Sequence, residues 1–215
     1  MKEIKEMFWA TGFFSLVMVI PVGAWQAFDF LGFKIKLLLW AVYFMVFTVA
    51  LVENFLRKRG MTWGEIGVSR GADLWRAAGV GLCGAALTVA GGWFGAQVLG
   101  FKSSSTTSME EFLIRQMAGG GLRASLLLAW FMLPIAVCEE LFFRGFLFNY
   151  LNKRRGLVFA VVASSVFFGL VHYYPVRIVY TVFYGLVWAG AYRFGGGLAA
   201  PVIAHYLHNV SCFYF

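Results

Sequence analysis

Long runs of apolar residues, separated by short polar stretches, dominate the chain. A transmembrane helix needs about 20 mostly apolar residues. Seven runs reach or approach that length, near residues 8–30, 35–56, 75–100, 124–151, 157–173, 176–193 and 197–214. The pattern therefore predicts an all-α fold, a polytopic transmembrane helical bundle of about seven spans, with eight as the other count that the boundaries allow.

Proline and capping residues refine this prediction. Pro175 lies at a proposed helix junction, where a helix ends or begins, and Pro134 lies inside the fourth run, where it predicts a kink. Between the third and fourth runs, Ser108 and Glu111 have the spacing of a capping box. We expect a short amphipathic interfacial helix near 109–117.

Composition assigns the whole chain, residues 1–215, to one integral membrane domain, with about three spans in its first 100 residues. Of its residues 61% are hydrophobic and 13% are charged, and the mean hydropathy is +0.77, whereas a soluble domain has about 25% charged residues. The net charge of +8 does not indicate nucleic-acid binding, because the basic residues cluster in short loops between apolar runs. The expected non-protein partner is membrane lipid. The three cysteines form no paired spacing that would predict a disulfide or zinc framework. All three lie inside apolar runs, and we expect them to be small buried residues.

Charge asymmetry predicts the orientation in the membrane. The N-terminus and the loops after the second, fourth and sixth runs carry 11 Lys and Arg residues, against 6 on the other side. Positively charged loops stay in the cytoplasm. The expected localisation is therefore a multi-pass protein of the cell membrane with a cytoplasmic N-terminus and a retained first helix.

Two adjacent carboxylates, Glu139 and Glu140, lie inside the fourth apolar run. Ionisable residues at membrane depth are costly and usually functional. On a helix, Glu140 and Arg144 are four residues apart and share a face, so they are expected to form a supporting pair. Glu139 points about 100° away and has no cation within reach on its own helix. It is the candidate general base or acid, and the other interpretation is that both carboxylates serve a structural ion network.

All three histidines lie in the last 44 residues. His205 and Asn209 are four residues apart on the last predicted helix, and His172 lies in a separate apolar run. A glutamate, two histidines and an asparagine that converge can hydrolyse an amide. Glu139 and His172 would deprotonate a water, and His205 and Asn209 would donate hydrogen bonds to the oxyanion. His208 lies on another helix face and is expected to be interfacial or structural.

One glutamate and two histidines are also a zinc-ligand set, so a zinc-dependent reaction stays open, although the predicted enzyme uses no cofactor and no metal. The HExxH pattern of zinc proteases and the Gly-x-Ser-x-Gly elbow of serine hydrolases are both absent from the sequence.

Three motifs in this order resemble the CPBP family (CAAX protease and bacteriocin-processing, or Abi) of glutamic-type intramembrane endopeptidases. They read EELFFR at 139–144, FGLVH at 168–172 and HYLHN at 205–209, and EIGV at 65–68 is similar to a short loop upstream in the family. The resemblance covers about residues 120–215, the expected catalytic core.

The resemblance implies that Glu139 is the catalytic base, that His172 assists it, and that His205 and Asn209 form the oxyanion site. Glu140 and Arg144 would be the supporting pair. The implied substrate is a protein or peptide cut near its C-terminus, with a lipidated tail or a sorting tail as options, and the implied location is a bacterial inner membrane. Two other functions remain open, a non-catalytic scaffold or immunity factor and a small transporter or proton relay.

The expected helix limits leave one conflict. They place Glu139 and His172 at depths that differ by about 14 Å in a bilayer core of about 30 Å. The two residues can meet only if the fourth helix is long or tilted, or if the fifth helix begins later.

Overall fold

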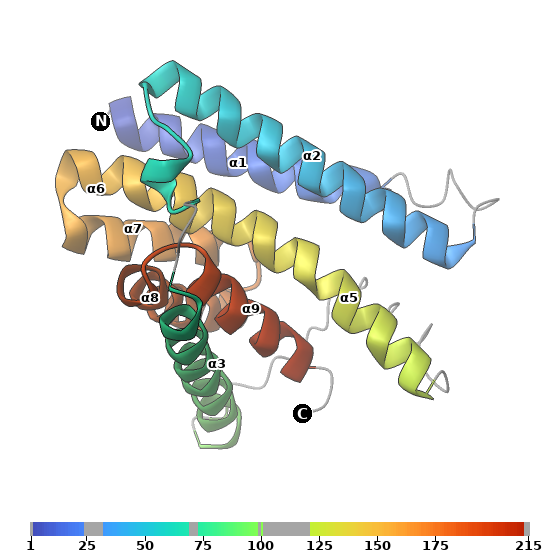
Figure 1. Ribbon diagram of the computed structural model, residues 1–215. Helices are drawn as coiled ribbons and strands as arrows, with labels where there is room; N and C mark the ends of the chain where they lie inside the picture. The colour runs from blue at the N-terminus through green and yellow to red at the C-terminus, as the bar shows by residue number, and fades with distance from the viewer. Residues whose placement is uncertain (1, 24–31, 69–72, 99, 101–120, 213–215) are drawn as a thin grey trace.

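The computed structural model describes residues 2–23, 32–68, 73–98, 100 and 121–212, and this part of the chain is helical, with no strands (Figure 1). Its elements, in chain order, are α1 (Lys2–Gly23), α2 (Phe33–Arg59), the 3-10 turn η2 (Gly64–Ile66), α3 (Leu74–Gln97), α5 (Gly121–Glu140), the π-helical segment η3 (Leu141–Phe148), α6 (Asn149–Arg155), α7 (Leu157–Leu170), α8 (Pro175–Gly195) and α9 (Ala199–Ser211).

The helical membrane bundle predicted from the apolar runs is confirmed. Because α5, η3 and α6 follow one another without a break, the described residues form seven helical rods, one for each predicted run. Three of them are long and apolar enough to cross a membrane, at Ile35–Arg59, Leu74–Gln97 and Ser125–Arg155. The capping box and the interfacial helix predicted near 109–117 lie outside the described residues.

Local chemistry explains several helix ends. The carboxylate of Asp73 accepts a hydrogen bond from the Arg76 backbone N–H and begins α3. Gly60 ends α2 with a positive φ of 61°, which glycine adopts at no steric cost. Pro175 opens α8 as predicted, and Pro134 lies inside α5 as predicted.

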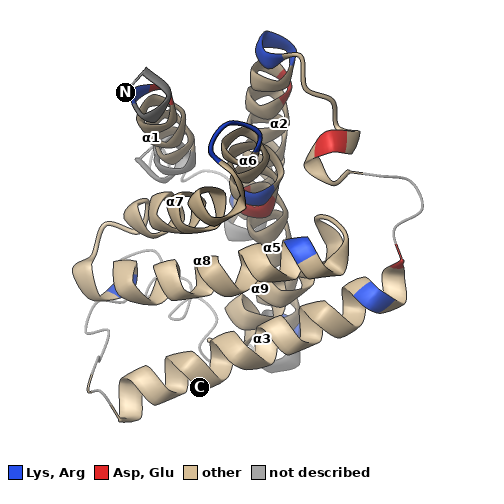
Figure 2. Ribbon diagram, turned by 90° about the vertical axis from the view of Figure 1, so that its left-hand side faces the viewer, with Lys and Arg blue, Asp and Glu red and all other residues tan. Residues whose placement is uncertain are grey.

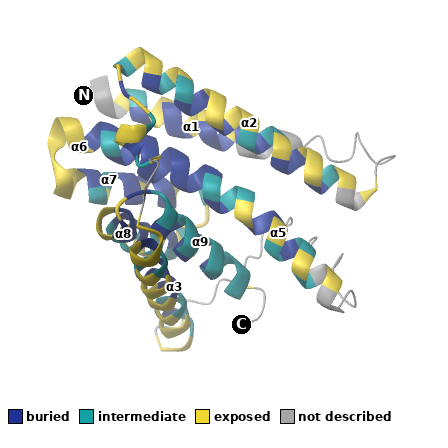
Figure 3. Cartoon of the chain, viewed as in Figure 1, coloured by how far each residue is buried: buried dark blue, intermediate teal, exposed yellow. Residues whose placement is uncertain are grey.

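The helices form two groups that meet at η3. In Figure 1, α1, α2 and α5 lie side by side, while α3 packs on α8 and α9, and α7 packs on α8. Every residue of η3 is buried, and Figure 3 shows the buried colour concentrated where α5 passes into η3. Aromatic rings fill this region; Phe14 of α1 stacks on Phe142 with ring centroids 4.3 Å apart. The core thus surrounds the segment that follows the two glutamates.

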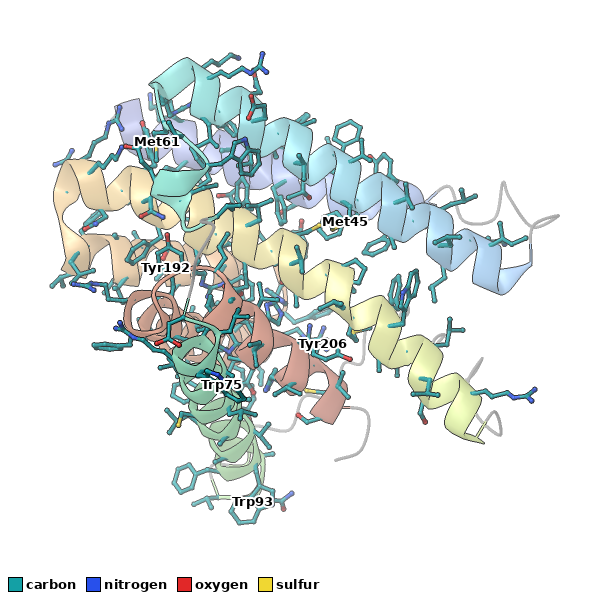
Figure 4. All side chains as sticks on the ribbon, in the orientation of Figure 1. Met45, Met61, Trp75, Trp93, Tyr192 and Tyr206 are labelled. Carbon is teal, nitrogen blue, oxygen red and sulfur yellow. The ribbon has the colours of Figure 1, made fainter. Side chains whose placement is uncertain are left out.

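The outer surface is apolar along the length of the helices, as a lipid-facing surface should be. Figure 4 shows Trp75 and Trp93 near the two ends of α3, where their side chains are 89% and 63% exposed. Eighteen residues of helix separate them by about 27 Å, close to the thickness of a bilayer core, and tryptophan favours both membrane interfaces. This spacing agrees with α3 crossing the membrane.

Charged residues gather at helix ends, and Figure 2 shows tan along most of each helix. Helix ends that the sequence assigned to one side of the membrane are tied together. Arg59 at the end of α2 pairs with Glu6 of α1 at 3.1 Å, and the Tyr150 hydroxyl of α6 donates to the same carboxylate. Lys153 at the end of α6 pairs with Glu65 of η2. We call this the basic end of the bundle.

The three cysteines carry no disulfide, as expected. Cys138 is buried, but Cys83 and Cys212 are exposed, so the expectation that all three are buried is wrong for these two. An apolar run gives no information about which side of its helix faces the protein.

Candidate active site

The two glutamates occupy the last turn of α5, and the helix changes there to the π-helical segment η3. π-helical turns are rare and are frequent at functional sites. In the wider π-helical turn the backbone carbonyl groups are paired differently from those of an α-helix. The Asn149 side-chain amide satisfies two of them, donating to the carbonyls of Arg144 at 3.0 Å and Gly145 at 2.7 Å. The apolar pattern gave no signal for this segment.

The ion pair predicted from the four-residue spacing is present. Arg144 Nη1 donates to Glu140 Oε1 at 2.8 Å, and both side chains are fully buried. The guanidinium also donates from Nη2 to the Gly185 carbonyl of α8 at 3.1 Å. It lies over the rings of Phe168 and Trp188, 4.6 and 5.4 Å from their centroids. Arg144 therefore joins the carboxylate helix to α7 and α8.

His205 lies between the two carboxylates. Its Nδ1 is 2.8 Å from Glu140 Oε1, and its Nε2 is 3.6 Å from Glu139 Oε2. The indole of Trp188 stacks on the imidazole with centroids 3.9 Å apart and an interplanar angle of 17°. His205 and Glu139 are only 2% and 4% exposed, so bulk water does not separate them.

This geometry fixes where protons can lie. A carboxylate oxygen paired with arginine only accepts, so the imidazole donates from Nδ1 to Glu140. The opposite nitrogen, Nε2, then faces the carboxyl group of Glu139. A proton on either group makes that contact attractive, and two bare acceptors would repel each other. His205 and Glu139 can therefore share and release a proton, which general acid–base chemistry requires.

A cavity of about 870 Å³ adjoins this cluster and is lined by parts of α3, α7, α8 and α9. His172, His205 and Asn209 all line it. Glu139 is not among the lining residues. The structure thus brings the predicted residues together in two linked groups: the two glutamates, Arg144 and His205 in the core, and His172, His205 and Asn209 at the cavity wall.

The predicted helix limits of 157–173 placed His172 inside a helix, but in the structure it lies in a turn. Helix α7 ends at Leu170, and the chain turns through Tyr173, which has a positive φ of 62°. In this turn His172 Nδ1 contacts the Phe168 carbonyl at 2.9 Å. A carbonyl only accepts, so Nδ1 carries the proton and Nε2 is the acceptor nitrogen of the neutral ring. Nε2 is then able to accept a proton from a water.

The depth conflict is resolved by the length of the fourth rod. Sixteen residues separate Glu139 from Arg155 at the basic end, about 24 Å at the helical rise. Thirteen residues of α7 separate Leu157, at the same end, from Leu170, about 20 Å, and His172 lies in the turn that follows. The long continuous rod brings both residues to similar depth.

His208, which was expected to be interfacial or structural, is buried against Tyr184 with ring centroids 4.2 Å apart, and it also lines the cavity. The contribution of α3 to the cavity wall was not predicted, because a run of small apolar residues carries no sign that its helix lies against the site. For His208, the available sign in the sequence was its position directly before Asn209.

A zinc site needs three or four ligand side chains close together. Among the described residues, no three His, Cys, Asp or Glu side chains lie close enough together to hold a metal ion. Glu140 Oε1 accepts hydrogen bonds from Arg144 and His205, whereas Glu140 Oε2 is buried without a hydrogen-bond partner in the described part of the chain. His172 Nδ1 donates to the Phe168 carbonyl.

One family model matches the chain, the Rce1-like model of type II CAAX prenyl endopeptidases, over residues 105–211. The matched stretch holds all three motifs and every candidate site residue. No curated protein and no solved structure shows significant similarity to the chain. With the helical membrane fold and the clustered motif residues, the match shows that the chain belongs to the CPBP family.

Proposed function

We propose that this protein is a glutamic-type intramembrane endopeptidase that hydrolyses a peptide bond in or near a membrane-associated, C-terminal segment of a protein substrate. The observation that carries the proposal is the position of His205, which lines the cavity and contacts both carboxylates. Family membership supports the reaction class.

In the proposed reaction, Glu139 is the general base. A water next to Glu139 and the Nε2 of His172 attacks the substrate carbonyl carbon and gives a proton to the glutamate. The new C–O bond places negative charge on the carbonyl oxygen. The C–N bond then breaks, and Glu139 returns the proton to the leaving amine, which balances the hydrolysis.

The oxyanion needs hydrogen-bond donors in a dry site. Asn209 offers a side-chain amide on the cavity wall, four residues and one turn from His205. His205 offers Nε2–H once it holds the proton it shares with Glu139. Glu140 and Arg144 act as positioning residues, since they fix the imidazole from its other nitrogen.

The proposal includes the setting of the enzyme. The N-terminus faces the cytoplasm of a bacterial cell, the protein lies in the cell membrane, and no metal takes part. The substrate tail is lipidated or carries a sorting signal, and the enzyme draws it from the membrane.

Comparative proteomics of membrane-protein C-termini, in wild-type cells and in cells with Glu139→Ala, identifies a substrate. Purified protein is then assayed on it. Removal of a general base costs about 10²–10⁴-fold in rate, and we expect that loss for Glu139→Gln.

Cys138→Ala is the matched control, because Cys138 adjoins Glu139 but directs its sulfur to Met45, at 3.3 Å. It should keep the wild-type rate. A folded Glu139→Gln variant that cleaves normally would overturn the assigned base. Normal cellular function of that variant without cleavage would favour a scaffold, and stoichiometric zinc in active protein would favour the metal reaction.

A further inference from the structure

The cavity is built from helix ends that point away from the basic end of the bundle. Its lining includes Trp93 and Gln97 in the last turns of α3, Arg177 in the first turn of α8, and Cys212 directly after α9. Its deep wall is Trp188, which stacks on His205. The cavity thus runs from the candidate active site toward one face of the membrane.

Helix lengths give the extent of this path. Eleven residues of α8 separate Trp188 from Arg177, and eleven residues of α3 separate Ala86 from Gln97. Each stretch is about 16 Å long. An extended peptide rises about 3.3 Å per residue, so about five residues of substrate fit along the wall.

The opposite end of the bundle carries most of the basic charge. The ends of α2 and α6 contribute RKR at 57–59 and KRR at 153–155, and ion pairs tie both ends to their neighbours. Helix α3 begins at this end, and α8 finishes there: Arg76 Nε donates to the Phe194 carbonyl at 2.7 Å. By contrast, Arg177 is the single Lys or Arg among the described residues that line the cavity.

We propose that the cavity opens to the non-cytoplasmic face of the membrane and receives the substrate tail from that side. Segments rich in Lys and Arg stay in the cytoplasm, which places the basic end there and the mouth of the cavity on the far face. The substrate is then a protein whose tail has crossed the membrane, or lies at its outer surface, before cleavage.

The chemistry of the wall supports this kind of ligand. Ala86, Val89, Ala90 and Trp93 give α3 an apolar surface along the path. Arg177 adds a positive charge near the mouth. An extended apolar tail that ends in a carboxylate matches both features. That the occupant of the cavity is a substrate rests on the proposed function, whereas the direction in which the cavity opens does not.

The test measures which face of the membrane reaches the cavity, with a membrane-impermeant maleimide–polyethylene glycol as probe. Cys212 is exposed and lines the cavity, and Cys138 is 1% exposed and serves as an internal negative control. Cys83→Ser removes the remaining thiol. We expect this variant to be modified in intact cells as fully as after permeabilisation.

A variant with a cysteine at the basic end is the matched control. Lys58→Cys, in a background with Cys83→Ser and Cys212→Ser, should be modified only after permeabilisation. Gln97→Cys in that background is a second cavity probe, in case the thiol of Cys212, which lies 3.7 Å from His208 Nε2, reacts slowly.

The reverse pattern would overturn the proposal: modification of the cavity cysteines only after permeabilisation, and of Lys58→Cys in intact cells. No modification of either cavity cysteine in both conditions would also overturn it, since the cavity would then not open to water. Adding Glu139→Gln should leave the labelling unchanged. A failed peptidase assay and a failed orientation are therefore distinguishable.

Discussion

Removal of Arg144 is expected to destabilise the protein strongly. Its guanidinium is fully buried and binds Glu140 at 2.8 Å, so Arg144→Met leaves a buried carboxylate without its cation. Breaking a buried pair in this way costs about 3–5 kcal/mol. The variant also loses the hydrogen bond to Gly185 and the contacts with the rings of Phe168 and Trp188. At about 1.4 kcal/mol per tenfold, the folding equilibrium constant falls by about 10²–10⁴.

A second substitution separates charge from packing. Glu140→Gln keeps a side-chain oxygen that accepts from His205 Nδ1 and removes the charge that Arg144 neutralises. Added to Arg144→Met, it should restore about 2–3 kcal/mol of the loss. The remainder reflects the lost hydrogen bond and ring contacts, which no change at Glu140 restores.

The free energy of unfolding is measured in mixed dodecyl maltoside and SDS micelles, from tryptophan fluorescence, for the wild type, both single variants and the double variant. The reasoning is refuted if Arg144→Met costs less than about 1 kcal/mol, the range of an exposed pair. It is also refuted if the double variant is no more stable than Arg144→Met, because the unpaired charge would then not be the source of the loss.

Two further predictions concern helix contact and pH. A Cβ added at Gly185 would lie 2.9 Å from the Ser165 Cα, so Gly185→Ala should cost about 1–3 kcal/mol by overpacking. Gly190→Ala on the same helix is the control, because its Cβ would meet nothing within 4 Å, and it should be tolerated. The same unfolding titration distinguishes the two variants. The hydrogen bond from Lys153 lowers the pKa of Glu65 below its usual 4.5. Its stabilisation is therefore present above that value and is lost as the pH falls through the lower folded pKa. Glu65→Gln should lower the thermal midpoint slightly at pH 7 and by less at pH 3, and an equal effect at both pH values would contradict this.

Much of the candidate site could be predicted because its parts are local. The pair of Glu140 and Arg144 follows from helical spacing, and the placement of His205 and Asn209 on one helix follows from the same rule. The direct contact between Glu139 and His205 was not predicted, because the expected partner was His172 and His205 lies 66 residues later in the chain than Glu139. No local period specifies which helices will cross.

The two errors about His172 and the exposed cysteines have a common cause. In a soluble helix, polar residues mark the outer face and so reveal the inner one. Here lipid and protein interior are both apolar, so Cys83 faces outward and Cys138 inward with no difference in pattern. In the same way the apolar run continues past Leu170, although α7 ends there and His172 lies in the turn.

The sequence by itself determined the all-helical membrane bundle, its seven rods and the residues able to carry the chemistry. These depend on the length of apolar runs, on charge and on spacing within one helix. Only the tertiary structure placed His205 between the two carboxylates, lengthened the fourth rod through the π-helical segment, and used α3 to wall the cavity. Each of these depends on how helices pack when every surface is apolar, where small residues and buried polar contacts, rather than a hydrophobic face, select the neighbours.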